Sequence, residues 1–221
     1  MQSLKQYKIK KIMKTALQIV LSIAVLLLGF FIWESIQKPI RFQKEYDLRK
    51  GKVVDRLIQI RDAQIAYKTV NNQYTASFDT LIDFIKNGEL PLVKMEGALT
   101  DSMIAAGINE TKALALGYIK RDTIKISVMD SLARNKYIPD SICFIPLTNG
   151  KKFELGHNVI TTASGVKVQV FEAKVPNEIF LNGMGKQDII NLNQIAKKLE
   201  RYPGLKVGSL EEANNNAGNW E

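Results

Sequence analysis

The segment Thr15–Trp33 reads TALQIVLSIAVLLLGFFIW and contains no charged side chain. A helix over this segment spans about 28 Å, close to the thickness of the hydrocarbon core of a bilayer. The sequence therefore predicts a transmembrane anchor over residues 15–34. Gln18 and Trp33 are its candidate partner contacts. Gln18 can bond a neighbouring helix or reach the headgroups, whereas the indole of Trp33 suits the membrane interface.

Residues 1–14 form a basic tail without an acidic side chain, and its lysines are Lys5, Lys8, Lys10, Lys11 and Lys14. A basic start before an apolar run also describes a cleaved signal peptide. However, this run exceeds the roughly 7–15 residues of a signal core. In addition, the bulky stretch Phe30–Trp33 stands where a signal peptidase needs small residues. We therefore expect an anchor that is retained.

The basic residues on the two sides of the span predict its orientation. Five lysines precede it, and Lys38, Arg41 and Lys44 follow it closely. Because the side richer in Lys and Arg stays in the cytoplasm, we expect a cytoplasmic N-terminus. The expected location is the bacterial inner membrane, crossed once, with the C-terminal domain in the periplasm.

Composition excludes several other classes of protein. The 221-residue chain has a formal charge of +9, and the lysines before the span supply much of it. No further basic block is interleaved with aromatic residues, so we expect no nucleic-acid partner. The single cysteine, Cys143, excludes an intramolecular disulfide.

Residues 35–90 are expected to form a helical stalk and a second helix. Val53, Leu57 and Ile60 begin an apolar stripe at three- and four-residue steps, which predicts a long amphipathic helix from Phe42 to Asn71. Pro39 either ends or kinks the membrane helix before it, and Gly51 is a candidate break. Ser77 is a suitable N-cap for the second helix, over 78–86.

Residues 91–208 are expected to form an antiparallel sheet with a C-terminal helix, and residues 209–221 a disordered tail. Within them, 95–121 is treated as an irregular connector, in which Asp101–Ala106 and Glu110–Leu116 are candidate short helices. The expected strands are 123–128, 142–145, 152–155, 178–181 and the hairpin Val159–Ala163 with Val166–Ala173 around Ser164-Gly165, and the expected helix is Gln187–Tyr202. Helices kept apart from an antiparallel sheet define an α+β fold.

This order of elements resembles type IV pilins and the pseudopilins of type II secretion. The stretch RDAQIAYKTVNNQYTASFDTLIDF, Arg61–Phe84, is similar to the helix, polar turn with a tyrosine and second helix of pseudopilins. The resemblance implies a long helix packed on an antiparallel sheet. The residues before Thr15 lack the glycine of the family's processing site, and Gly29-Phe30 with Glu34 repeats its spacing only at the far end of the apolar run.

The chain offers few residues for catalysis or for binding a metal. Cys143 and His157 are the one thiol–imidazole combination, but Cys143 lies in the apolar run ICFI, where a thiol usually packs as a small hydrophobe. Asp122, Asp130 and Asp140 are too widely spaced to indicate a metal site. Gly183-Met184-Gly185 lacks the third glycine of a nucleotide-binding loop, since position 188 is Asp. We expect no catalytic residues, cofactor or metal.

Two groups of aromatic residues have alternative interpretations. Tyr67, Tyr74, Phe78 and Phe84 have the spacing of a helical core, and a ligand cleft is the alternative. Trp220 stands alone in the polar tail, where it is either free or docks into a partner as an interface anchor.

These features predict a non-enzymatic envelope protein with a single membrane span. Its expected role is that of a structural or assembly subunit of an inner-membrane, periplasmic or secretion-type complex. The expected partners are the lipid bilayer and other membrane or envelope proteins, and the sequence indicates no small-molecule substrate. The alternative is an anchored periplasmic ligand-binding or sensory module, and an enzyme of unfamiliar type is the third hypothesis.

Overall fold

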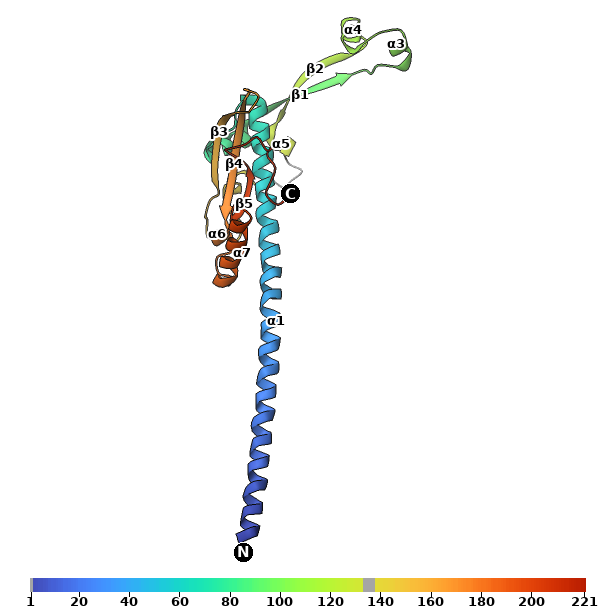
Figure 1. Cartoon of the computed structure of the whole chain (residues 1–221). Helices are drawn as coiled ribbons and strands as arrows, with labels where there is room; N and C mark the ends of the chain where they lie inside the picture. The colour runs from blue at the N-terminus through green and yellow to red at the C-terminus, as the bar shows by residue number, and fades with distance from the viewer. Residues whose placement is uncertain (1, 133–137) are drawn as a thin grey trace. The chain divides into compact units, whose positions relative to one another are not determined.

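The computed structural model describes residues 2–132 and 138–221. The chain divides into two compact units, one up to Leu48 and the other from Arg49 to Glu221. Helix α1 (Gln2–Asn71) begins in the first unit and ends in the second (Figure 1). Pro39 lies inside this helix and Gly51 does not break it, so neither residue ends the helix. Its end at Asn71 agrees with the sequence prediction.

In the first unit, α1 is long and apolar enough to cross a membrane. Its most apolar 18-residue window has a mean hydropathy of 2.4, and none of that window is buried. Leucine, isoleucine and phenylalanine side chains of this part are more than half exposed, for example Leu26 at 74% and Phe31 at 63%. A helix of this composition is stable when an apolar phase replaces water around it. The unit therefore has the properties of a membrane-anchoring helix near the N-terminus.

In the second unit, the same helix contributes one side of the core. Val53, Leu57 and Ile60 are completely buried, as their helical spacing predicted. Helix α2 (Phe78–Asn87) follows, and the backbone N–H of Thr80 donates to the Ser77 hydroxyl, which confirms the predicted N-cap. Four more helices are short: α3 (Asp101–Ala105), α4 (Glu110–Ala115), α5 (Val128–Leu132) and α6 (Asn177–Phe180). Helix α7 (Lys186–Lys198) ends earlier than the predicted Tyr202.

Strands β1 (Glu89–Glu96) and β2 (Lys120–Ser127) form a separate antiparallel ribbon, with α3 and α4 between them along the chain (Figure 1). The sequence predicted most of β2 but not β1. Leu90-Pro91-Leu92 indicated only that the preceding helix cannot continue. A two-stranded ribbon has only edge strands, which tolerate Pro. The predicted irregular connector 95–121 therefore contains the end of β1, two helices and the start of β2.

The second sheet has the order β3-β4-β5, and both of its strand pairs are antiparallel. Strands β3 (Glu154–Thr161) and β4 (Lys167–Pro176) form the predicted hairpin. The N–H of Thr162 donates to the Val166 carbonyl at 2.9 Å, which leaves residues 163–165 in the loop. The loop is therefore longer than the predicted two-residue turn. Gly165 supplies a φ of +78° in this loop, a conformation that glycine adopts without a steric penalty.

Two predicted strands are wrong, and one strand of this sheet was missed. Residues 142–145 follow a short 3-10 helix, Pro139–Ser141, and make an isolated bridge between Phe144 and Lys152 instead of a strand. Residues 178–181 belong mainly to α6. Strand β5 (Gly204–Gly208) was not expected, because Pro203-Gly204 looked only like a helix stop. In each case, tertiary pairing decided between local alternatives that a short apolar run leaves open.

The C-terminal segment 209–221 also differs from the disordered tail that its polar sequence predicted. The Gly208 N–H donates to the Ala217 carbonyl at 3.0 Å, and the Asn219 N–H donates to the Lys206 carbonyl at 3.0 Å. The segment thus pairs along β5 and covers the edge of the sheet. Arg61 of α1 forms an ion pair with Glu221 at 2.6 Å. Mixed helices and antiparallel sheets make the whole chain compatible with an α+β fold.

Candidate functional site

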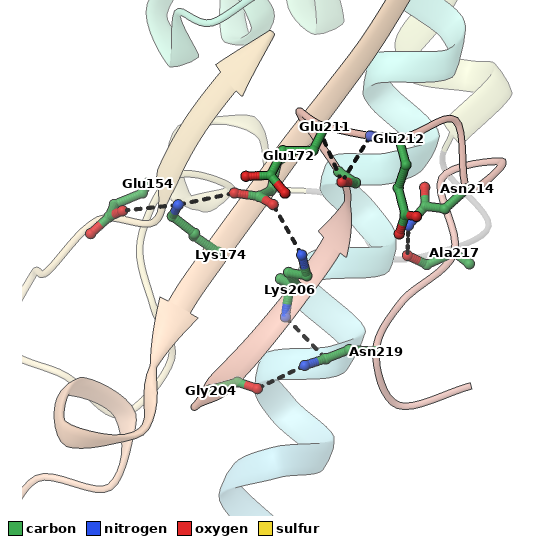
Figure 2. Close-up of polar contacts among 11 residues, drawn as sticks. Glu154, Glu172, Lys174, Gly204, Lys206, Glu211, Glu212, Asn214, Ala217 and Asn219 are labelled. Carbon is green, nitrogen blue, oxygen red and sulfur yellow. Dashed lines mark hydrogen bonds and ion pairs between the residues drawn. The ribbon is translucent and has the colours of Figure 1, made fainter. Parts of the chain in front are cut away.

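A network of polar side chains in the second unit lies on the face of β4 and β5 opposite the core. Alternation along β4 sends Phe171, Ala173 and Val175 into the core, where each is at most 1% exposed. Glu172 and Lys174 therefore share the other face. The register places Lys206 of β5 directly beside Lys174. Figure 2 shows the carboxylate of Glu172 between these two lysines.

Glu172 holds both lysines through separate oxygens. Lys174 Nζ lies 3.0 Å from Glu172 Oε1, and Lys206 Nζ lies 3.3 Å from Glu172 Oε2. Lys174 also lies 3.9 Å from Glu154 on β3, so the network crosses all three strands (Figure 2). The Glu172 side chain is only 10% exposed, which reduces solvent screening of these pairs.

The C-terminal segment covers this network. A Cβ placed on Gly156 would meet Leu210 Cδ1 at 3.1 Å, so Leu210 packs on β3 where glycine leaves room. The Asn158 side chain donates to the Leu210 carbonyl at 3.0 Å. The Ser209 hydroxyl accepts bonds from the N–H groups of Glu211 and Glu212 at 3.2 and 3.3 Å, and this turn continues the segment over the sheet (Figure 2).

Two pKa values report the electrostatics of the site. The hydrogen bond to Glu172 raises the pKa of Lys174 above its usual value. Burial, followed by the negative charges of Glu154, Glu172 and Glu178, raises the pKa of Tyr202 to about 12. The Lys174 ammonium also lies 5.9 Å from the centre of the Tyr202 ring. The arrangement keeps Lys174 protonated and Tyr202 neutral, so it favours a fixed charge network over proton transfer.

These raised pKa values predict a loss of stability in alkaline solution. A raised pKa means that the folded state binds the proton more tightly, so stability is complete below the unfolded-state value of about 10 and falls above it. For Tyr202 the loss extends toward pH 12. Tyr202→Phe cannot ionise and is expected to show a shallower fall of the urea unfolding midpoint between pH 10 and 12.

The control for this experiment is Tyr118→Phe, because Tyr118 is 52% exposed on another part of the unit. We expect this variant to follow the wild-type pH profile. Identical profiles for Tyr202→Phe and the wild type would show that Tyr202 ionisation does not couple to unfolding.

A second candidate site is an open hollow of about 590 Å³ beside α6 and α7. Its lining combines apolar and polar side chains: Glu178, Asn182, Gly183, Met184, Lys186, Ile189, Ile190 and Asn193. Arg49 Nη1 donates to the Asn182 carbonyl at 2.8 Å and thereby holds the loop between the two helices. Asn177 donates to Asn193 at 2.7 Å, and Asn193 donates to Glu178, so one polar wall is fixed by its own hydrogen bonds.

The three predicted partner contacts differ in their exposure. Gln18 is exposed on α1, and Trp33 is 66% exposed. Trp220 is half-buried. Its ring packs over Gly218, because a Cβ on that glycine would lie 2.4 Å from the indole. Trp220 thus has an intramolecular contact in the folded tail.

The residues considered as catalytic candidates occupy positions that folding contacts explain. Cys143 is 3% exposed and its thiol lies 3.9 Å from the Asp140 carbonyl. His157 is exposed within β3, in register with Phe171. Asp140 pairs with Lys86 at 2.6 Å. Within residues 2–132 and 138–221, no group of three His, Cys, Asp or Glu side chains could hold a metal ion.

The aromatic residues and the glycine-rich loop are also accounted for by packing. Tyr67 and Phe84 make an edge contact at 5.1 Å, and Tyr74 lies 4.8 Å from Phe171. The loop Gly183-Met184-Gly185 leads into α7, and Asp188 lies so close to Gly185 that a Cβ there would meet its carboxylate at 2.4 Å.

Sequence reasoning missed the network around Glu172. A signal was present, because Glu172 and Lys174 stand two residues apart among the apolar residues of the second half of β4. No sequence pattern indicated that Lys206 belongs to the network, since β5 itself was not predicted. Comparison of the chain with family models, with curated proteins and with solved structures found no match.

Proposed function

We propose that this chain is a non-enzymatic, single-pass envelope protein of the bacterial inner membrane that serves as a structural or assembly subunit of a larger complex. In this proposal its N-terminus is cytoplasmic and its C-terminal domain is periplasmic. The observation that carries it is the dual character of α1: one continuous helix provides an exposed apolar segment and, through Val53, Leu57 and Ile60, the buried core of a domain.

The proposal includes a pilin-like architecture, in which the long helix packs on the three-stranded sheet. The contact of Tyr74, just after α1, with Phe171 of β4 supports it. The hydrogen bonds from Arg49 to the carbonyls of Phe180 and Asn182 also support it, because they connect α1 to the chain that follows β4. A fixed charge network under a folded tail suits a scaffold that must keep its shape within an assembly.

Crosslinking of the full-length protein in native membranes, followed by identification of the products, tests this function. We expect products that contain other envelope proteins or further copies of the chain. A protein that remains monomeric and partnerless, both after crosslinking and after mild solubilisation, would contradict the proposed role.

The orientation has its own test. Glu212→Cys places a thiol on an exposed position of the domain, whereas the native Cys143 is buried. We expect a membrane-impermeant maleimide to label this variant in intact spheroplasts. Labelling only after lysis would reverse the proposed topology.

The hollow beside α6 and α7 favours a second function, an anchored ligand-binding or sensory module. Met184, Ile189 and Ile190 offer apolar contact, and Glu178 and Lys186 offer opposite charges nearby. Pockets that bind small molecules commonly combine such surfaces. Ile189 is mostly buried, so Ile190→Glu, at a position 47% exposed, is the variant that would abolish ligand binding without disturbing the core.

A further inference from the structure

The ribbon of β1 and β2 has one face on which apolar and charged pairs are separated along its length. Side chains alternate between the two faces of a strand, so every second residue of each strand shares this face. From the end next to α5 toward α3 and α4, the cross-strand pairs are Leu90–Ile126, Leu92–Ile124, Lys94–Asp122 and Glu96–Lys120. We call these eight residues the ribbon face. Two apolar pairs are thus followed by two pairs of opposite charge.

The apolar half of the ribbon face is open to solvent. Leu92 is 47% exposed and Ile124 is 37% exposed, while Leu90 and Ile126 are half-buried. Antiparallel sheets usually bury one face, and an isolated two-stranded ribbon is only marginally stable in water. A surface that covers these aliphatic side chains would therefore stabilise the ribbon.

The charged half of the ribbon face restricts which partner surfaces can cover it. The signs alternate both along and across the ribbon, because Lys94 lies beside Asp122 and Glu96 lies beside Lys120. Any partner must therefore present apolar groups at one end and a matching pattern of alternating charges at the other.

The ribbon face itself meets this requirement. We infer that its occupant is the ribbon face of a second copy, related by a two-fold axis parallel to the strands. Such a rotation lays each β1 over the partner copy's β2 at the same level. Leu92 then meets Ile124 of the partner copy, and Lys94 meets Asp122 of the partner copy. Glu96 meets Lys120 in the same way, so every contact is complementary.

Other symmetric arrangements are less favourable. A two-fold axis in the interface but perpendicular to the strands would set the Leu90–Ile126 end of one copy against the charged Glu96–Lys120 end of the other. That arrangement buries charges against aliphatic side chains, which costs free energy without an ion pair in return. Charge complementarity therefore selects both the occupant and the axis.

The pairing deepens the proposed function and rests on its membrane anchor. A ribbon face is small compared with a standard interface of about 1,600 Å². Two copies held in one membrane have a raised effective concentration, which allows such a small surface to pair. The ribbon would then connect neighbouring subunits.

Disulfide formation in the full-length chain tests the geometry. Differently tagged copies carrying Leu92→Cys and Ile124→Cys are co-expressed and oxidised in native membranes. We expect the mixed disulfide to exceed either self-disulfide by about threefold, since disulfides require closely opposed Cβ atoms. Thr123→Cys is the matched control on the other face of β2, and we expect it to form only background dimer. Equal yields at Thr123 and Ile124 would overturn the proposal.

Charge reversal separates contacts between copies from contacts within one copy. Asp122→Lys or Lys94→Glu in both copies is expected to lower the mixed disulfide at least about tenfold, because like charges then face each other across the interface. Asp122→Lys in one copy with Lys94→Glu in the other is expected to restore it, although repulsion within each ribbon remains. Lys125→Glu, on the opposite face, is expected to have no effect.

Absence of rescue in the mixed combination would contradict pairing of the ribbon faces. This outcome is distinguishable from failure of the proposed function, because crosslinking of the wild-type chain in native membranes tests that function separately. Crosslinked envelope complexes that form without the ribbon disulfide would leave the subunit role intact and overturn only the ribbon pairing. A wild-type chain that is monomeric in native membranes would overturn both.

Discussion

Replacing Gln64 with leucine is expected to lower the free energy of unfolding by about 3 kcal/mol, within a range of about 2–5 kcal/mol. Gln64 is completely buried on α1, and its amide makes two hydrogen bonds to the backbone of Thr75. Nε2 donates to the Thr75 carbonyl at 2.7 Å, and Oε1 accepts from the Thr75 N–H at 3.1 Å. Leucine fills a similar volume but satisfies neither backbone group, so two buried polar groups lose their partners.

Urea unfolding of the full-length chain in detergent micelles measures this effect. In a Trp33→Phe background the fluorescence reports Trp220, which is half-buried in the folded tail. Gln73→Leu is the matched control, because Gln73 is exposed in the turn after α1. We expect the control to change the midpoint little. Equal midpoints for Gln64→Leu and Gln73→Leu would show that the bonds to Thr75 do not hold α1 to the turn.

Replacing Phe171 with alanine is expected to cost about 3–5 kcal/mol, the range for removing a buried aromatic side chain. Phe171 is completely buried on the core face of β4, and its ring centre lies 4.8 Å from that of Tyr74. The loss includes buried apolar area, the cavity left behind and the contact between the two rings. Domains are typically stable by about 5–15 kcal/mol, so the variant is expected to be partly unfolded at moderate temperature.

The same fluorescence assay applies to this variant, with far-UV circular dichroism as a second probe. Phe144→Ala is the matched control, since Phe144 is 39% exposed at its isolated bridge with Lys152. We expect it to cost less than about 1 kcal/mol, as surface substitutions usually do. A Phe171→Ala midpoint close to that of Phe144→Ala would mean that the sheet does not depend on the contact with Tyr74.

The helices were largely predictable because their signals are local. The stripe that begins with Val53, Leu57 and Ile60 required only the 3.6-residue period, and the end of α1 at Asn71 followed from the polar Asn71–Asn72 pair. Ser77 was identified as an N-cap because capping involves groups only a few residues apart. The β3–β4 hairpin was also predicted, since its strands are neighbours in sequence.

The ribbon and β5 were not predictable in the same way. Leu90 pairs with Ile126 and Lys206 pairs with Lys174, so each pairing joins segments far apart in the chain. A short strand has too few residues for its period to stand out, and its partner decides whether it forms. The same reason explains why the run 142–145, apolar but without a long partner, did not become a strand.

Of the candidate site, the sequence contained Glu172 and Lys174 at a spacing that places them on one face of a strand. It contained nothing that assigned a second lysine to Glu172, because Lys206 reaches it only through the pairing of β4 with β5. The position of residues 209–221 over the network was not predictable from the sequence either. Its polar residues predict disorder when no partner is known, and they fold here by pairing with the edge of β5.

The sequence by itself therefore determined the apolar segment Thr15–Trp33, the helix that continues from it and the amphipathic face of that helix. These depend on composition and on contacts within a few turns, which are written directly in the order of residues. Only the tertiary structure decided the strand partners, the cover over Glu172 and the ribbon face. These depend on which distant segments meet, and that is set by the summed packing and hydrogen bonding of the whole domain rather than by any local pattern.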